Sequence, residues 1–272
     1  MNGKIVVAAV AAALAAAPAA AQERVDQRVA TSGTGVVEIN NVAGSVRVVG
    51  WNRNEVHVTG TVEEGVERVE VREEGGRVVV RVVLPRRSYH SDGDAELEVH
   101  VPAGKDVDVH TVSADATVEE LDGRADVQTV SGEVRVSGHP REAQLQTVSG
   151  DVEIVGVRGR VEVQTVSGDV HMDGRGIQAQ VRTVSGDVRI DGELDPGGTN
   201  QVNTHSGDVV FTIARGGGAQ VEFGSFSGEV NSSIPGGMRM QGSSRNQHLE
   251  VGRGGPRIMV HTFSGDLTLN ER

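Results

Sequence analysis

The sequence predicts an all-β chain that winds into a right-handed parallel β-helix, a β-solenoid with coils of about 18 residues. Three observations lead to this fold: one heptapeptide recurs at a fixed interval, apolar and polar residues alternate as in strands, and glycine is abundant while proline is sparse. The heptapeptide reads QTVSGDV at 146–152 and 164–170, QTVSGEV at 128–134 and RTVSGDV at 182–188. Because stacked coils lie about 4.8 Å apart, equal positions lie over one another and favour the same residue.

The serine of the heptapeptide marks the coils. The intervals between successive serines are 18, 18, 18, 18, 21, 21 and 37 residues, and the last interval is about two coils long. The stretch MRMQGSSRNQHLEV fits that gap as a degenerate copy with Ser244 in the serine place, and VEINNVAGSVRV at 37–48 is an earlier copy with Ala43 there. The serines are Ser113, Ser131, Ser149, Ser167, Ser185, Ser206, Ser227 and Ser264.

Each coil shows the periodicity of β-strands. In RVEVQTVSGDVHMDG, Val161 and Val163 alternate with polar residues, and after Gly168 the apolar positions Val170 and Met172 continue with the opposite parity. An extra residue at a glycine corner would keep both strands facing one core. Left-handed β-helices carry one aliphatic residue in every six, whereas aliphatic residues here recur at steps of two, which favours the right-handed form.

Four segments are expected along the chain. Lys4, an apolar run and the small residues APAAA predict a signal peptide over 1–21 that is cleaved after Ala21; the competing interpretation, a membrane anchor, is disfavoured because the run is shorter than about 20 residues. A flexible mature N-terminus (22–35), an N-terminal rung with a covering β segment (36–106) and regular solenoid repeats (107–272) should follow. Leu267 and Leu269 would lie in an uncovered last rung.

Composition excludes several classes of protein. The formal charge of −12 disfavours nucleic acid as a partner, and the absence of cysteine means that packing and backbone pairing must stabilise the fold. Aromatic residues make up only 2 % of the chain, so the core should be built from small side chains.

The first candidate site is an acidic column that follows the glycine in each copy. Neighbouring carboxylates about 4.8 Å apart repel one another by about 0.9 kcal/mol in water, so something should offset that repulsion. Either each carboxylate accepts backbone N–H groups in an Asx-type turn, or Ca²⁺ ions lie between the rungs. The candidates are Asp115, Glu133, Asp151, Asp169, Asp187, Asp208, Glu229 and Asp266.

The second candidate is the column between the threonine and the serine of each copy. If threonine and serine point inward, this column points outward, and its tolerance of valine, histidine and phenylalanine agrees with an exposed position. An exposed apolar strip is typical of an interaction surface; the alternative is that the parity is reversed and the side chains form core. The strip comprises Val112, Val130, Val148, Val166, Val184, His205, Phe226 and Phe263. A third column, Gln128, Gln146, Gln164 and Arg182, is expected to be a solvated polar face.

The repeat also carries a family resemblance. The scheme I-x-V-x-T-x-S-G-D-V-x-V, preceded by ELEVHVPAGKDVDVHTVSA, resembles the bacterial DUF4097 β-strand-repeat family over about residues 36–270. The resemblance implies a right-handed β-helix that is exported or membrane-tethered and labelled adhesin-like. It supplies no catalytic residues to transfer.

Catalysis finds little support in the pattern. The serines lack fixed histidine and aspartate partners, the nine histidines are dispersed, and a phosphate-binding motif is absent. We therefore expect an exported, periplasmic or extracellular, non-enzymatic module without cofactor and without a transmembrane segment in the mature chain. It would present a rigid acidic surface to a protein or a cell-envelope component, or associate with itself. Two alternatives are a scaffold that assembles through the solenoid ends and a carbohydrate-active β-helix enzyme.

Overall fold

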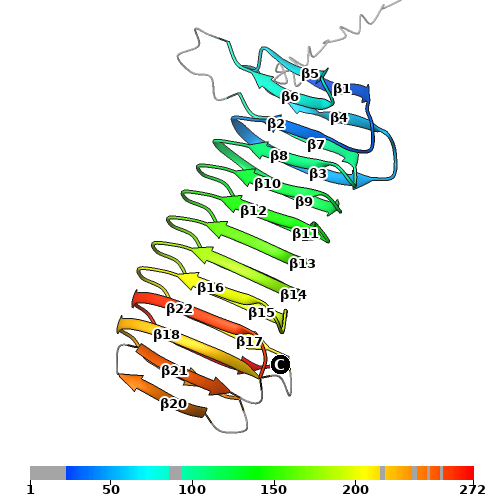
Figure 1. Cartoon of the computed structure of the whole chain (residues 1–272). Coiled ribbons are helices and arrows are strands. Elements are labelled where there is room, and N and C mark those ends of the chain that lie inside the picture. Colours follow the sequence, from blue (N-terminus) through cyan, green and yellow to red (C-terminus); the bar gives the residue numbers. More distant parts are fainter. Residues whose placement is uncertain (1–22, 86–92, 215–217, 235–237, 244–245, 252–253) are drawn as a thin grey trace, which may run out of the picture.

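The computed structural model describes residues 23–85, 93–214, 218–234, 238–243, 246–251 and 254–272. The predicted signal peptide at 1–21 lies outside these residues. The described part of the chain is built from β-strands, turns and bends, and it holds no helix long and apolar enough to cross a bilayer. The strands stack into one long column, with β1 near one end and β20 at the other (Figure 1). The all-β prediction is confirmed, and the parallel stacking agrees with a β-solenoid.

Each regular coil contributes one strand to each of two facing sheets. All neighbours within the regular part are parallel, and the register pairs equal positions of successive repeats, for example Val152 with Val170 and Gln146 with Gln164. The strands are β8 (Asp106–His110), β9 (Ser113–Leu121), β10 (Arg124–Gln128), β11 (Val134–Gly138), β12 (Glu142–Gln146), β13 (Val152–Gln164), β14 (Val170–Arg182), β15 (Val188–Leu194), β16 (Thr199–Asn203) and β17 (Val209–Ile213). The two 13-residue strands β13 and β14 serve both sheets, with register shifts between their halves.

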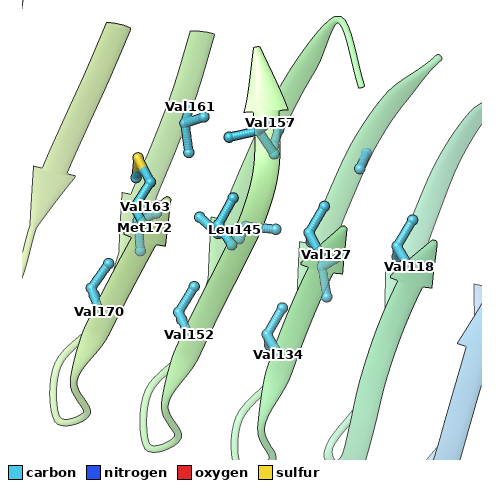
Figure 2. Packing of buried hydrophobic residues seen from close by; sticks show 14 of the residues in the cluster. Val118, Val127, Val134, Leu145, Val152, Val157, Val161, Val163, Val170 and Met172 are labelled. Carbon is cyan, nitrogen blue, oxygen red and sulfur yellow. The ribbon is translucent and has the colours of Figure 1, made fainter. Parts of the chain in front are cut away.

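The core lies between the two sheets. Alternate residues of each strand point inward, so that Val134, Val152 and Val170 form a row on successive strands, with Leu145 and Val163 in view nearby (Figure 2). These side chains are fully or almost fully buried. Small and medium side chains fill a narrow space here, which explains how the fold manages with few aromatic residues.

The heptapeptide forms the corner between the sheets. Thr165 is buried, Val166 and Ser167 are both exposed, and burial resumes at Val170. The expectation that threonine and serine both point inward is therefore wrong for serine. Two consecutive residues face solvent because the chain turns at this point.

Gly168 enables this turn. Its φ of 148° lies in the region that favours glycine, and a Cβ there would lie 2.2 Å from the carbonyl oxygen of Gly150 in the neighbouring coil. Coils can stack at strand spacing only where this side chain is absent.

At the N-terminal end, one layer lies out of sequence order. The layer of β2 and β3 lies between the layer of β6 and β7 and the layer of β8 and β9, all with parallel pairing. Antiparallel strands complete the end: β4 pairs with β7, β1 with β4, and β5 with β6. The strands are β1 (Glu23–Ala30), β2 (Val36–Asn40), β3 (Ala43–Trp51), β4 (Glu55–Val62), β5 (Arg68–Glu74), β6 (Arg77–Val83) and β7 (Ala95–Pro102). Because β1 is paired along its length, the stretch expected to be flexible contains an ordered strand.

The C-terminal end also contains a layer that lies out of sequence order. The layer of β22 and β23 is inserted between the layer of β16 and β17 and the layer of β18 and β19, and Figure 1 shows β22 in red between β16 and β18. An antiparallel hairpin, β20–β21, pairs with β18 on its outer side. The strands are β18 (Ala219–Ser227), β19 (Val230–Ser232), β20 (Met238–Ser243), β21 (Asn246–Val251), β22 (Arg257–Ser264) and β23 (Leu267–Glu271).

Two expectations for this end are therefore wrong. The stretch MRMQGSSRNQHLEV forms the antiparallel hairpin instead of a degenerate coil, and Ser244 itself lies outside the described residues. The rung of Leu267 and Leu269 is covered on both sides, by β17 and β19. The premise of a scaffold that assembles through a bare last rung fails for this reason.

Candidate interaction surface

A row of half-exposed valines runs along the corner of the regular coils. The exposed fractions are 47 % for Val112, 48 % for Val130, 47 % for Val148, 47 % for Val166 and 49 % for Val184. The near-identical values follow from the identical corner in each coil. The structure thus places these side chains outside, where the sequence left two parities open.

Val42 extends the row by one level. The backbone N–H of Ser113 donates to the carbonyl of Val42 at 2.7 Å, as the N–H of Ser131 donates to the carbonyl of Val112. Val42 is 37 % exposed. Sequence reasoning missed it, although the early copy VEINNVAGS places Val42 just before Ala43, where the later copies have valine before serine.

Three rings continue the row at the C-terminal end. His205 stacks on Phe263 and Phe263 on Phe226, with centroid separations of 5.0 Å and interplanar angles of 14° and 4°. Phe263 lies in the middle because β22 is inserted between β16 and β18. We call the whole row the apolar ridge; in spatial order it comprises Val42, Val112, Val130, Val148, Val166, Val184, His205, Phe263 and Phe226.

A groove runs beside the ridge. Its volume is about 490 Å³, and it lies over the buried threonines, between the valines and a row of polar side chains. We call that row the amide column, after its glutamines; its members pair level by level in parallel register and comprise Asn40, His110, Gln128, Gln146, Gln164, Arg182, Asn203 and His261. The glutamines and Arg182 are half-buried or exposed, in agreement with the expected polar face.

The threonines beneath the groove are nearly buried. Thr111 and Thr204 donate their hydroxyls to the carbonyls of Ala114 and Ser206, each at 3.2 Å. The hydroxyl oxygens of Thr129, Thr147, Thr165 and Thr183 are buried without a hydrogen-bond partner. The groove floor therefore offers methyl groups more readily than hydroxyls.

The acidic column lies on the other side of the ridge and binds the coils to one another. The carboxylate of Asp169 accepts the backbone N–H of Asp187 at 2.8 Å, and that of Asp151 accepts the N–H of Asp169 at 2.9 Å. The same bond joins Asp115 to Glu133, Asp187 to Asp208, Asp208 to Asp266 and Asp266 to Glu229. The expected backbone acceptance is present, but it links successive coils instead of closing an Asx-type turn within one coil.

These hydrogen bonds offset part of the repulsion within the acidic column. A charge-assisted bond to a backbone N–H offsets the repulsion between neighbouring carboxylates. Glu133, whose side chain is longer, pairs with Arg135 at 2.8 Å. Among the residues that the structure describes, no group of three or more histidine, aspartate or glutamate side chains is arranged to hold a metal ion. Ca²⁺ binding by the column stays a prediction.

A second cluster, missed by sequence reasoning, lies at the N-terminal end. Trp51, His57 and His100, on β3, β4 and β7, form a triangle in which each ring contacts the other two, with Arg53 over the Trp51 ring at 4.8 Å. The Nε2 atom of His57 lies 2.8 Å from a carboxylate oxygen of Asp26, which ties β1 to β4. With ring contacts and ion pairs around it, the cluster fastens the covering strands.

Comparison with known proteins identifies the family of the chain. The chain is similar to solved structures described as a "putative adhesin" from Bacteroides fragilis (8 % identity, 91 % of this chain and 97 % of that chain, TM-score 0.48) and from Parabacteroides distasonis (9 % identity, 92 % and 97 %, TM-score 0.47). We found no curated protein that matches the sequence. The sequence model of the family described as Toastrack DUF4097 matches residues 25–270, from the first covering strand to the last inserted one. The chain therefore belongs to the Toastrack DUF4097 family.

Proposed function

We propose that the protein is an exported, non-enzymatic, adhesin-like module that binds a protein or a cell-envelope component through the apolar ridge. The observation that carries this proposal is the continuous row of half-exposed apolar side chains along one corner. Soluble proteins rarely expose contiguous apolar patches unless the patches serve an interaction. A β-solenoid, wound as a right-handed parallel helix, holds such a row straight and rigid.

The energetics suit a binding surface. Full burial of a valine is worth about 1.5–3 kcal/mol, so burying the remaining half of each ridge valine would contribute about 0.7–1.5 kcal/mol. The five valines of the regular coils together offer roughly 4–7 kcal/mol, before the entropy of association is subtracted. The stacked phenylalanines add further apolar area at one end.

Export and the lack of catalysis rest on other features. The predicted signal peptide at 1–21 would direct the chain out of the cytoplasm. The corner serines form parallel bridges from coil to coil, as between Ser149 and Ser167, so their repetition has a structural reason. The negative formal charge disfavours nucleic acid.

The test compares the ridge with an exposed valine elsewhere. Val155 is 39 % exposed but lies within β13, away from the corner. A photo-crosslinking residue at Val148 should capture defined partners in the native cell, and the same residue at Val155 should not. The variant Val148→Asp with Val166→Asp should lose these partners while its melting temperature stays near that of Val155→Asp. Equal capture from both positions would contradict the proposal.

A further inference from the structure

We propose that the apolar ridge binds a second copy of this chain, with the ridge of each copy in the groove of the other and the two solenoid axes running in the same direction. This inference rests on the proposed function, because it takes the ridge to be an interaction surface. It goes further by naming the partner and the geometry.

The spacing of the ridge favours this partner. Ridge side chains recur once per coil, at the strand spacing of about 4.8 Å. An extended peptide repeats its side chains on one face at about 6.6 Å, so its side chains lose register with those of the ridge after a few residues. A second solenoid of the same sequence has the same spacing at every level. A partner built from stacked parallel coils keeps one contact geometry along the whole row, and a second copy of this chain is such a partner.

Symmetry then selects the direction. A twofold axis parallel to the solenoid axis places the left flank of one copy opposite the right flank of the other. If the twofold axis lies between the ridge and the groove, the ridge of each copy then meets the groove of the other. A twofold axis across the ridge makes the two solenoids antiparallel and places each flank opposite the same flank of the other copy. The two ridges must then face one another. Only the parallel arrangement lets both ridges fill both grooves at once.

Charge selects the same direction. The groove is flanked by the amide column, which carries amides, imidazoles and Arg182, whereas the other flank carries the acidic column. Arg182 and Gln164 already bind the carboxylate of Glu162, each at 3.0 Å, so the unpaired amides carry the complementarity. In the parallel arrangement the amide column of each copy lies toward the acidic column of the other. Gln146 is exposed and can donate its amide N–H groups to carboxylates there. The antiparallel arrangement, with the twofold axis across the ridge, would instead bring the two acidic columns together, with like charges repelling.

The size of the surface suits a concentration-dependent dimer. Nine levels of the ridge span about 38 Å, and the five residues from the amide to the acidic column span at most about 17 Å, so each copy offers at most about 650 Å². Stable interfaces bury about 800 Å² per partner. The corner alone therefore supplies at most about four fifths of that area.

The first experiment measures the oligomeric state of the purified protein. Light scattering and sedimentation should show a concentration-dependent dimer. Val148→Asp with Val166→Asp should raise the dissociation constant at least about a hundredfold, whereas Val155→Asp should leave it within about twofold. Gln146→Glu should weaken the dimer about tenfold, with a larger effect at low salt, because it places a new carboxylate opposite the acidic column. A chain that stays monomeric at every accessible concentration would overturn the inference.

The second experiment fixes the direction and does not depend on destabilising variants. The chain has no cysteine, so single cysteines report unambiguously. Val112→Cys, Val148→Cys and Val184→Cys should each give a covalent dimer through a disulfide or a short bis-maleimide, because equal levels are adjacent when the axes are parallel. Val155→Cys should give none. Crosslinking at no more than one of the three levels would refute the parallel arrangement.

The two proposals fail in different ways. If the protein is monomeric but the Val148→Asp and Val166→Asp variant still loses its partners in the cell, the dimer is wrong and the binding function stands. If the ridge variants change neither property, both proposals fail.

Discussion

The glycine of the corner provides the sharpest test of the stacked-coil architecture. Replacing Gly168 by alanine would place a Cβ 2.2 Å from the carbonyl oxygen of Gly150, and real Cβ atoms need at least about 3.0 Å. The matched control is Gly176→Ala, where φ is 65° and nothing lies within 4 Å of the added Cβ. Both substitutions force a residue with a Cβ into the positive-φ region, but only the first collides with the neighbouring coil.

The magnitudes follow from these contacts. The strain of a positive φ amounts to about 1–2 kcal/mol at either site. At Gly168 the coil must also move by nearly 1 Å away from the coil of Gly150, which weakens the bond from the N–H of Gly150 to the carbonyl of Ser167, now 3.1 Å long, and loosens the packing beside it. We therefore expect a loss of about 3–5 kcal/mol for Gly168→Ala and about 1–2 kcal/mol for Gly176→Ala.

Urea unfolding monitored by circular dichroism measures both losses. The dependence of the unfolding free energy on urea should stay similar in the two variants, so that the midpoints can be compared directly. Equal midpoints for Gly168→Ala and Gly176→Ala would refute the close stacking of backbone at the corner.

Three further outcomes are expected. Asp169→Ala should unfold at lower urea than the wild type because the N–H of Asp187 loses its acceptor. Asp169→Asn keeps an acceptor oxygen and relieves like-charge repulsion, so its urea midpoint at low salt should match or exceed that of the wild type. Millimolar Ca²⁺ should leave the melting temperature unchanged if the acidic column serves only coil pairing; a rise with Ca²⁺ and not with Mg²⁺ would show that the column binds cations. Lys105 is fully buried and donates to the carbonyl of Thr34 at 2.8 Å, and burial lowers its pKa below the ordinary 10.5. Between that lowered pKa and 10.5 the unfolded chain binds more protons than the folded chain does, so the wild type should gain stability relative to Lys105→Met as the pH rises through this window. Curves of unfolding free energy against pH that run parallel for the two proteins would contradict this prediction.

Much of the candidate site could be predicted from the repeat. The register of the heptapeptides predicted that equal residues form columns, and the structure pairs Gln146 with Gln164 and bridges Ser149 to Ser167. The variety of side chains in the ridge positions favoured an exposed column. The orientation of Ser167 was missed because strict alternation places it inward, whereas the corner leaves both Val166 and Ser167 exposed. Alternation holds within a strand and fails where the backbone turns.

The order of layers at the two ends could not be predicted. The copy around Ser264 follows the copy around Ser227 in sequence, yet it bridges to Ser206 and lies between the two. Both orders use the same strands with the same local patterns, so local sequence does not distinguish them. The inserted layer covers its own apolar residues on both sides and leaves an antiparallel hairpin at the edge.

The sequence by itself determined the all-β class, the parallel stacking of repeats and the existence of the valine and acidic columns, because these follow from a pattern that every coil repeats. Only the tertiary structure decided which layer lies next to which at the ends, that three rings extend the ridge in a new order, and that carboxylates bind the coils together. These features depend on pairing between residues far apart in the chain, and such pairing depends on the burial and hydrogen bonding of whole layers.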